Sequence, residues 1–474
     1  MADPTPLAPR PRRSITRLAV PSVAVATFAL GLLTSGTEVD AAPARDAPNV
    51  LLIVTDDQRD GQESMSVMPQ ARGLFGEAGT EFSNAHATTP MCCPSRASIF
   101  SGRYVHNHGV TDNGSDLARP DKTWQRHLDD AGYDTALYGK FLNSWLDRRP
   151  NETIPYFDHS WQGYGPDHEK NPLEPERFLV ERATGFLEQA ERNDSQPWAM
   201  VLATRSPHSP YRYPDRFRRD VGDFHPKPSV RDDLSDKPAY VRHTAHALRR
   251  RIRRGATMLK PGNVYTAQLR ELLAVDEMIG EVFELLRGMS EDERTLAILV
   301  SDNGFFWGEH SLPGKKFPYR ESIEVPLYVR WPGRVAAGAV DHRLAATIDI
   351  APTIMDATGV VPRYEPDGRS LLDGPWARRG LLLEGPNRLW RSYLTAGRQY
   401  IRWADGSREY YDLGRDPFQQ HNALASSVDV VGGHRVRGRR RRKLTVARSV
   451  ARRQARRLQA SLHRAARCAG NTCP

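Results

Sequence analysis

Four polar side chains that follow two apolar runs are suited to hold a divalent cation. Asp56 and Asp57 come directly after the first run, and Asp302 and Asn303 come directly after the second. Carboxylate and amide oxygens are the hard ligands that Ca²⁺ or Mg²⁺ prefers. No His or Cys is among these four positions, which argues against zinc. One Asp-Asp pair after a strand is more often a turn or a helix cap, but an equivalent pair after a second run favours a metal site.

The chain has four cysteines, and two of them, Cys92 and Cys93, are adjacent and precede Pro94-Ser95-Arg96. Adjacent cysteines rarely bridge to each other because the link is strained. Taken alone, the pair would be two small buried residues or a redox site. The other two, Cys468 and Cys473, enclose a short loop, where a disulfide is easy to form if the chain is exported. A metal clip at this loop would lack two further ligands.

The cysteine pair lies in a longer stretch that resembles the signature of the sulfatase family. Cys92-Cys93-Pro94-Ser95-Arg96 is followed by Ser101-Gly102-Arg103, as in C-x-P-S-R and then T/S-G-R. Residues 47–420 contain more stretches that match the family, in the family's order. They are Pro48-Asn49-Val50 through Gln58, His106-Asn107-His108-Gly109, Tyr138-Gly139-Lys140-Phe141-Leu142-Asn143, Pro207-His208-Ser209-Pro210 and Ser301-Asp302-Asn303-Gly304 through Val325-Pro326. The subgroup most similar contains N-acetylglucosamine-6-sulfatases and extracellular heparan sulfatases.

This resemblance implies a sulfate ester hydrolase of the alkaline-phosphatase superfamily with a modified nucleophile. In the family, the first Cys of the signature, here Cys92, is oxidised to formylglycine by a formylglycine-generating enzyme. One hydroxyl of the hydrated aldehyde attacks the sulfate ester, and deprotonation of the other expels sulfate. Pro94 and Arg96 help the modifying enzyme to recognise the segment, and Arg96 then stabilises the formylglycine and the metal environment.

The resemblance also implies the ligands of the metal and the cations that hold the sulfate. A single Ca²⁺ would be bound by formylglycine 92 and by Asp56, Asp57, Asp302 and Asn303. Lys140 and Lys315 would grip the sulfate oxygens. His208 would lie near the bridging oxygen and, with Lys315, could protonate the leaving alcohol. A lone lysine is usually a surface residue, but the matching neighbours of these two favour the functional interpretation.

The motifs leave a rival for one lysine and an unassigned base in the cationic set. Lys316 is a rival to Lys315, and the spacing of four residues before Tyr319 favours Lys315. Many sulfatases have a His two residues after the Lys140-like position, where this chain has Leu142. The base that releases sulfate is therefore unassigned, and its candidates are His106, His108 and His310.

The apolar patterns predict the elements that position these residues. Four continuous runs are typical of strands buried on both faces of a parallel sheet: 49–55, 198–204, 295–301 and 325–330. Helical patterns alternate with them, at 123–131, 174–192 and 263–287. We therefore predict an α/β fold with a large mixed, mostly parallel sheet sandwiched by helices, alkaline-phosphatase-like by resemblance. The polar residues follow the strands, where such sheets bind ligands.

Four segments are expected along the chain: a signal peptide at 1–44, a catalytic domain at 45–362, a smaller α+β subdomain at 363–430 and an Arg-rich helical tail at 431–474. The first has a basic start, an apolar run at Leu18–Leu33 and small residues for cleavage. We expect a secreted or cell-envelope protein with no stable membrane span after cleavage, because the run is short for a span. The twin arginines Arg12-Arg13 leave the export route open.

Two regions outside the predicted sheet have their own patterns. Residues 209–262 are rich in Pro, Arg and Asp with little periodicity, and we interpret them as a long surface insertion that could shape substrate entry. Residues 393–404 and 409–413 are expected to be short antiparallel strands joined by a turn at 404–407.

The chain has a net charge of +10, but the tail carries it: residues 431–474 contain 13 arginines, one lysine and no acidic residue, so residues 45–430 are net acidic. Apolar residues recur at helical spacing between residues 443 and 466. They are Leu444, Ala447, Ala451, Ala455, Leu458, Leu462 and Ala465. We favour a helix docked on the body, and a polyanion-binding helix is compatible with it.

The sequence leaves two other functions open. A phosphonate or phosphate monoester hydrolase could use the same scaffold and aldehyde, because sulfate and phosphate are similar tetrahedral groups. A non-catalytic protein could bind polyanions through the basic tail, although the complete set of motifs argues against it.

Overall fold

The structure is a computed structural model of the chain. It describes residues 47–143, 145, 153–162, 175–193, 196–374, 376–425, 430–431, 434–435 and 438–474. The predicted signal peptide lies outside the described residues.

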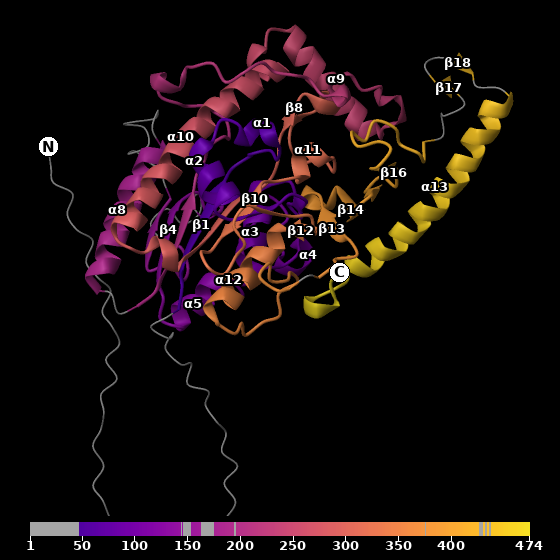
Figure 1. Ribbon diagram of the computed structural model, residues 1–474. Coiled ribbons are helices and arrows are strands. Elements are labelled where there is room, and N and C mark those ends of the chain that lie inside the picture. The colour runs from indigo at the N-terminus through magenta and orange to yellow at the C-terminus, as the bar shows by residue number, and fades with distance from the viewer. Residues whose placement is uncertain are drawn as a thin grey trace, which may run out of the picture. The chain divides into compact units, whose positions relative to one another are not determined.

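An eight-stranded sheet forms the centre of the fold (Figure 1), in the order β11-β2-β10-β7-β1-β6-β4-β5. Its strands are β1 (Asn49–Thr55), β2 (Thr80–Phe82), β4 (Asp134–Gly139), β5 (His159–Trp161), β6 (Trp198–Ala203), β7 (Thr295–Ser301), β10 (Leu327–Arg330) and β11 (Ala339–Asp341). The five strands from β7 to β5 run parallel to one another, and β10 is antiparallel to both of its neighbours. The prediction of a mixed, mostly parallel sheet is confirmed.

The side chains of β1 explain why helices cover both faces of the sheet. Val50, Leu52 and Val54 point into one hydrophobic core, and Leu51 and Ile53 point into the other, as the two-residue period of a strand requires. The first core is closed by α3 (Cys92–Ser101), α5 (Trp124–Asp130) and α12 (Ile350–Thr358), and the second by α2 (Pro69–Ala71), α8 (Pro175–Asn193) and α10 (Pro261–Gly288). Both faces of the sheet are therefore buried, as the apolar runs predict.

A second, antiparallel sheet of four strands follows, in the order β13-β14-β15-β16. Its strands are β13 (Leu381–Glu384), β14 (Trp390–Thr395), β15 (Arg398–Trp403) and β16 (Arg408–Asp412). The turn predicted at 404–407 joins β15 to β16. The single strand predicted at 393–404 is wrong, because a two-residue hairpin loop at Ala396 and Gly397 divides it into β14 and β15.

The insertion at 209–262 contains a helix that the sequence interpretation missed. Helix α9 (Ala239–Arg253) buries Val241, Ala245 and Leu248, which have the i, i+4, i+7 spacing of one helix face. Arginine and histidine fill most of its other positions, so the apolar stripe is narrow. The insertion is therefore partly ordered by its own hydrophobic face.

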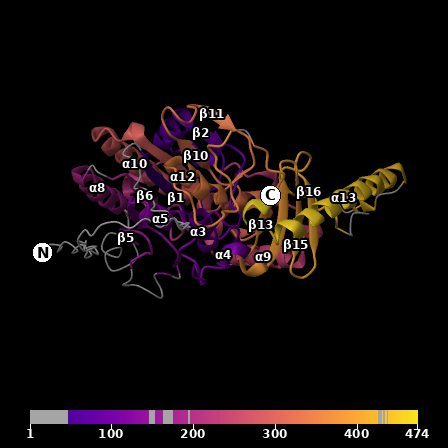
Figure 2. The same cartoon turned by 90° about the horizontal axis from the view of Figure 1, so that it is seen from below.

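Helix α13 (Gly438–Ala465) lies against the second sheet, as Figures 1 and 2 both show. Its apolar residues Ala451, Ala455, Leu462 and Ala465 are buried there, so the docked helix is confirmed over this part. The side chains of Leu444 and Ala447 lie outside the described part of the chain. The expected disulfide joins Cys468 to Cys473.

The remaining elements are short. The α-helices are α1 (Gln62–Met65), α4 (Val105–His108) and α11 (Arg320–Ile323), and the strands are β3 (Ala85–His86), β8 (Phe306–Trp307), β9 (Pro313–Gly314), β12 (Ala345–Ala346), β17 (Val430–Val431) and β18 (His434–Arg435). A π-helical segment, η1, spans Arg72–Glu77, and 3₁₀ turns are η2 (Asp215–Phe217), η3 (Pro228–Arg231), η4 (Leu234–Asp236), η5 (Thr257–Leu259), η6 (Asp292–Arg294), η7 (Glu309–Ser311), η8 (Thr347–Asp349), η9 (Pro386–Arg388) and η10 (Gly470–Thr472). Within the described residues, no helix has the length and apolarity of a membrane span.

Leu52 offers a test of the central packing. Its side chain is completely buried in the middle of β1. Leu52→Ala leaves a cavity and is expected to lower the free energy of unfolding by about 2–5 kcal/mol. Val340→Ala, on edge strand β11 where the side chain is 52% exposed, is the control and should change it by less than ~0.5 kcal/mol. Chemical denaturation measures both, and equal effects would contradict the described core.

Candidate active site

The two acidic pairs meet because β1 and β7 are parallel neighbours in register. Thr55 pairs with Ser301 at the ends of the two strands, so the residues that follow lie side by side. The backbone N–H of Asp302 donates to the carbonyl of Thr55 at 3.0 Å, and the N–H of Asp57 donates to Oδ1 of Asp302 at 3.3 Å. Asp57 has a φ of 71°, a left-handed conformation that Asp tolerates better than most residues.

These residues form a candidate cation site. One carboxylate oxygen from each of Asp56, Asp57 and Asp302 lies within 4.8 Å of the others, and all three side chains are buried. The amide nitrogen of Asn303 donates to Oδ1 of Asp57 at 2.6 Å, while its Oδ1 is buried with no hydrogen-bond partner among the described residues. A hard divalent cation would use such an oxygen, so the donor set fits the ion that the sequence predicts.

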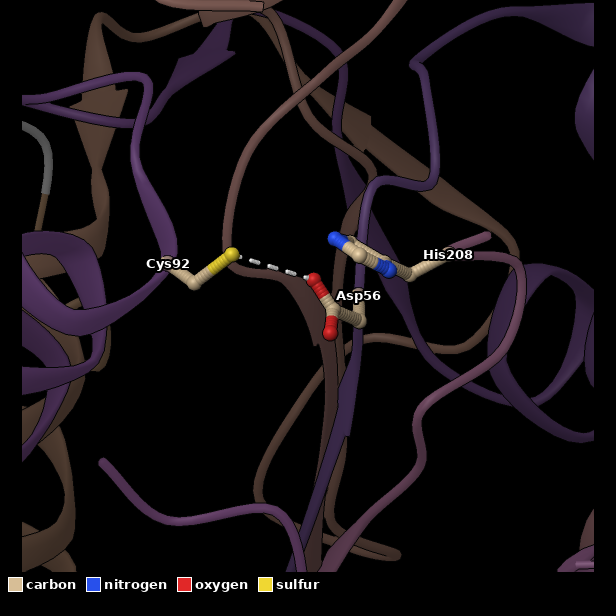
Figure 3. Close-up of side chains that lie close together, drawn as sticks. All are labelled: Asp56, Cys92 and His208. Atoms are coloured by element: carbon tan, nitrogen blue, oxygen red, sulfur yellow. Dashed lines mark hydrogen bonds between the residues drawn. The ribbon is translucent and has the colours of Figure 1, made fainter. Parts of the chain in front are cut away.

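Cys92 is the first residue of α3 and points at this cluster (Figure 3). Its Sγ lies 3.4 Å from Oδ1 of Asp56 and 2.8 Å from Nζ of Lys315. Burial, and then the negative charge of Asp56, raise the pKa of the Cys92 thiol to about 12. Because a thiolate is the reactive form of cysteine, this thiol is a poor nucleophile as it stands.

Three buried cations balance the three carboxylates. Lys140 is ion-paired with Asp56, Lys315 with Asp57, and Nε of Arg96 donates to Oδ2 of Asp302 at 2.8 Å. These pairs are joined, because Arg96 also donates to the backbone carbonyl of Lys140. The cluster therefore combines cation ligands with three fixed positive charges that could hold an anion.

The pairing controls the charges of the cluster. Burial by itself would raise the pKa of Asp56, but Lys140 and the other nearby cations outweigh it and hold the pKa below the ordinary value. Burial by itself would lower the pKa of Lys315, but the charges of Asp57 and Cys92 raise it well above the ordinary value. Burial and the charge of Asp56 raise the pKa of Asp302. Lys315 thus stays protonated, and Asp56 stays ionised.

His208 completes the cluster at its solvent side. It follows β6, and one ring nitrogen lies within 4.8 Å of the candidate ligand atoms of Asp56 and Cys92. Its Nδ1 faces the carbonyl of Ser209, which can only accept, so Nδ1 carries the hydrogen. Its Nε2 lies 3.8 Å from Oδ2 of Asp57 and the side chain is 31% exposed. Nε2 is thus the nitrogen available to a bound group.

The three histidines considered as bases contact other groups. His106 contacts Glu384 and the carbonyl of Cys468, and His108 contacts Ser98. His310 is buried against Asp232. The position two residues after Lys140 holds Leu142, which is buried in a hydrophobic core.

Lys315 and its neighbour point in different directions. Lys315 is buried and contacts Asp57 and Cys92, whereas Lys316, with a φ of 88°, is exposed. The cluster thus contains Cys92 and the eight other predicted site residues. These eight are Asp56, Asp57, Arg96, Lys140, His208, Asp302, Asn303 and Lys315.

Sequence analysis missed Gln268 on α10. Its Nε2 donates to the carbonyls of Pro207, at 3.1 Å, and Asp57, at 3.4 Å, and its Oε1 accepts from the indole of Trp307 at 2.6 Å. It joins the ends of β1 and β6 to the segment that leads to Lys315. The sequence does contain a signal for Gln268: it is a polar residue on the same helix face as the apolar Tyr265 and Leu272.

The fold is that of the alkaline-phosphatase-like α/β enzymes. Solved structures that share it include a protein in complex with its substrate D-glucosamine-2-N,6-O-disulfate (TM-score 0.69, 21% identity, covering 87% of this chain and 98% of that chain) and a phosphonate monoester hydrolase of Agrobacterium radiobacter (TM-score 0.66, 20% identity, covering 88% and 96%). At these identities the likeness concerns the fold.

The family follows from the sequence. The sulfatase family profile matches residues 48–360, and the chain belongs to this family of sulfuric ester hydrolases. It is 29% identical to human N-acetylglucosamine-6-sulfatase over 419 residues, covering 82% of this chain and 74% of that protein. It is 28% identical to the extracellular sulfatase SULF-1 homolog of Drosophila melanogaster over 364 residues, covering 70% of this chain. The chain spans about a third of that Drosophila protein (32%) and about half of a Caenorhabditis elegans homolog (48%).

The ion pair of His106 predicts a pH-dependent stability. Burial would lower the pKa of His106, but the hydrogen bond and charge of Glu384 raise it above the ordinary value. A raised pKa in the folded state contributes stability that is complete below the unfolded pKa of about 6.5 and is lost as the pH rises through the folded pKa. His106→Gln should therefore destabilise the protein more at pH 5.5 than at pH 8.5, measured by chemical denaturation.

His246→Gln, at an exposed position of α9, is the control for His106 and should change stability by less than ~0.5 kcal/mol at both pH values. A His106→Gln effect of the same size at pH 5.5 and pH 8.5 would show that the charged imidazole is not the form bound to Glu384.

Gln268 is expected to act as a positioning residue. Gln268→Met keeps the length but leaves two buried carbonyls and the indole of Trp307 without a partner. We expect kcat on an aryl sulfate to fall about 10- to 100-fold with little change in KM, because displaced groups cost rate more than binding. Gln125→Met, equally buried on α5, is the matched control. Equal losses of kcat in both variants would indicate a general structural effect.

Proposed function

We propose that this chain is an exported sulfatase that hydrolyses sulfate monoesters through a formylglycine made from Cys92 and a bound Ca²⁺. One observation carries the proposal: within the sulfatase signature, Cys92 is a weakly nucleophilic thiol that lies against Asp56 and Lys315 in a cluster of fixed charges. The family supplies the reaction class, and the chemistry of the cluster suits an anionic ester.

Asp56, Asp57, Asp302 and Asn303 would hold the Ca²⁺, with residue 92 as a further ligand. The partnerless Oδ1 of Asn303 and the proximity of the three carboxylates support this assignment. When bound, the ion would supply positive charge beside the sulfate, and the hydrated aldehyde would supply a hydroxyl nucleophile.

The chain's own cations would bind and orient the sulfate. The ammonium group of Lys315 is buried beside Cys92, and that of Lys140 is buried beside Asp56, which contacts Cys92. Both ammonium groups would hold sulfate oxygens. Arg96 lies on α3 one turn after Cys92, and its contacts with Asp302 and the carbonyl of Lys140 keep the residues around position 92 in place. Groups fixed in this way need no reorganisation when negative charge moves to the leaving oxygen.

His208 is proposed as the acid that protonates the leaving alcohol. Its Nδ1 hydrogen is held by the carbonyl of Ser209, so the proton to be transferred is the one on Nε2, which faces the cluster from its exposed side. Lys315 would assist from the buried side. Because His106, His108 and His310 contact other groups, His208 is also the strongest candidate for the base that releases sulfate.

The substrate class is proposed from chemistry and from relatives. Sulfated glycans or aryl sulfates are expected, and the relatives include N-acetylglucosamine-6-sulfatases. Maturation would need a formylglycine-generating enzyme as a partner. The basic, apolar N-terminus supports a secreted or cell-envelope location. A phosphonate or phosphate monoester hydrolase stays the alternative, because phosphonate monoester hydrolases share the fold.

The state of residue 92 tests the proposal. Mass spectrometry of the tryptic peptide from Gly73 to Arg96, from protein made in its native or a related host, should show formylglycine at position 92 and a thiol at Cys93. The same protein should hydrolyse an aryl sulfate faster than an aryl phosphonate, and Cys92→Ala should lose at least about 10³-fold in kcat because the nucleophile is gone.

Two results would contradict the proposal. Active protein with two unmodified cysteines would exclude the aldehyde mechanism. A large preference for the phosphonate ester would make the alternative hydrolase the function. Cys93→Ala is the matched control and should keep the modification, because the Sγ of Cys93 faces the carbonyl of Asn113 and accepts from the backbone N–H of Asn143.

A further inference from the structure

Exposed arginines from two distant parts of the sequence gather on one surface. Five of them lie on helix α13, at Arg452, Arg453, Arg456, Arg457 and Arg464, and Arg467 follows just after the helix ends. The second sheet adds Arg402 of β15 and Arg408 of β16, which are exposed cross-strand neighbours. These eight residues are called the arginine face below.

A contact between the helix and the sheet brings the two groups of arginines together. The guanidinium of Arg402 lies 3.1 Å from the ring of His463 on α13. The helix packs on β14 and β15 through Ala451, Ala455 and Leu462. The arginines of the helix therefore lie on its outer side, and Arg402 of the sheet lies beside the helix at His463.

The charge of this face has no carboxylate partner among the side chains that the structure describes. Residues 431–474 contain no acidic residue, and among the described side chains none of the eight arginines forms an ion pair with a carboxylate. Exposed arginines elsewhere do: Arg218 pairs with Asp215 at 2.6 Å, and Arg216 with Glu277 at 2.7 Å. The face therefore repels itself.

The spacing of the arginines adds to this repulsion. Arg452 and Arg456, like Arg453 and Arg457, are four residues apart on the helix, and Arg402 lies opposite Arg408. Like charges at these spacings are destabilising. A bound polyanion would remove the repulsion, whereas a single small anion could not, because Arg452 to Arg464 spans about 18 Å of helix.

The structure argues against two other anionic partners, a membrane surface and a single-stranded nucleic acid. A membrane-surface helix inserts its apolar side into the lipid, but that side of α13 is buried against the sheet. Single-stranded nucleic acids are held by aromatic stacking, and residues 431–474 contain no Phe, Trp or Tyr. A sulfated polysaccharide needs neither feature, because its charged groups suit exposed guanidinium groups.

We propose that the arginine face binds a sulfated polysaccharide, the polymer that carries the ester groups on which the active centre acts. This inference rests on the proposed function for the identity of the ligand. Binding at the face would hold the polymer on the enzyme and raise the local concentration of sulfate esters. The effect concerns polymeric substrates and leaves small esters unaffected.

The test compares full-length variants on immobilised heparin, a sulfated polysaccharide. R452Q/R453Q/R456Q/R457Q removes four exposed charges, keeps the buried side of α13 and replaces Arg with another good helix former. The wild type should be retained at 0.15 M NaCl and the variant should elute at lower salt. The slope of log K against log[salt] should fall by about 3, from four lost contacts.

R177Q/R218Q/R287Q/R363Q is the matched control, because it removes the same charge from exposed arginines that have acidic partners elsewhere. It should elute with the wild type. Both variants should keep the wild-type kcat/KM on a small aryl sulfate, while KM for sulfate release from the polymer should rise at least about 10-fold in the α13 variant only.

Three results would overturn the inference. They are equal elution of the α13 variant and the wild type, equal weakening by the control variant, and tighter binding to duplex DNA than to heparin at the same salt. Failure of the proposed function is seen separately, since it would abolish hydrolysis of the small aryl sulfate in all three proteins without changing their elution from heparin.

Discussion

Carboxylates buried at the end of a strand are unfavourable unless opposite charges lie beside them. Parallel pairing of β1 and β7 brings three such groups together, and each has a buried cation from another segment as its partner. The carboxylates belong to Asp56, Asp57 and Asp302, and the cations to Arg96, Lys140 and Lys315. Removing any one of the six would leave an uncompensated buried charge, so the ends of β1, β4 and β7 and the start of α3 depend on one another.

The remaining layers hold this cluster in place. Helix α3 sets Cys92 and Arg96 one turn apart, so one contacts Asp56 and the other Asp302. On the opposite face of the sheet, Gln268 of α10 ties together the backbone after β1 and after β6. Packing on both faces of the sheet thus supports the charged groups, and the partly exposed His208 lies on the solvent side of the cluster. A sulfate ester could approach from that side.

Charge is distributed unevenly over the molecule. Residues 45–430 are net acidic although the candidate site contains fixed cations, and the excess of arginine lies in the tail. Docking of α13 on the second sheet through Ala451, Ala455 and Leu462 turns the arginines outward and places them beside Arg402. The buried cations of the candidate site and the exposed arginines of the tail are therefore two separate groups of positive charge.

Local patterns in the sequence by itself determined four of the eight strands of the central sheet and the acidic pairs that follow two of them, because each is an apolar run followed by polar residues. The other residues of the cluster were predicted from the resemblance of their motifs to the sulfatase family. Sequence analysis did not find Gln268 or helix α9, and it divided the second sheet wrongly. The spacing before Tyr319 already favoured Lys315 over Lys316, but only the tertiary structure decided that Lys315 contacts Cys92 and that His106 and His310 contact Glu384 and Asp232, respectively. Those outcomes depend on contacts between segments tens to hundreds of residues apart, where burial and charge pairing, and not local pattern, select the partner.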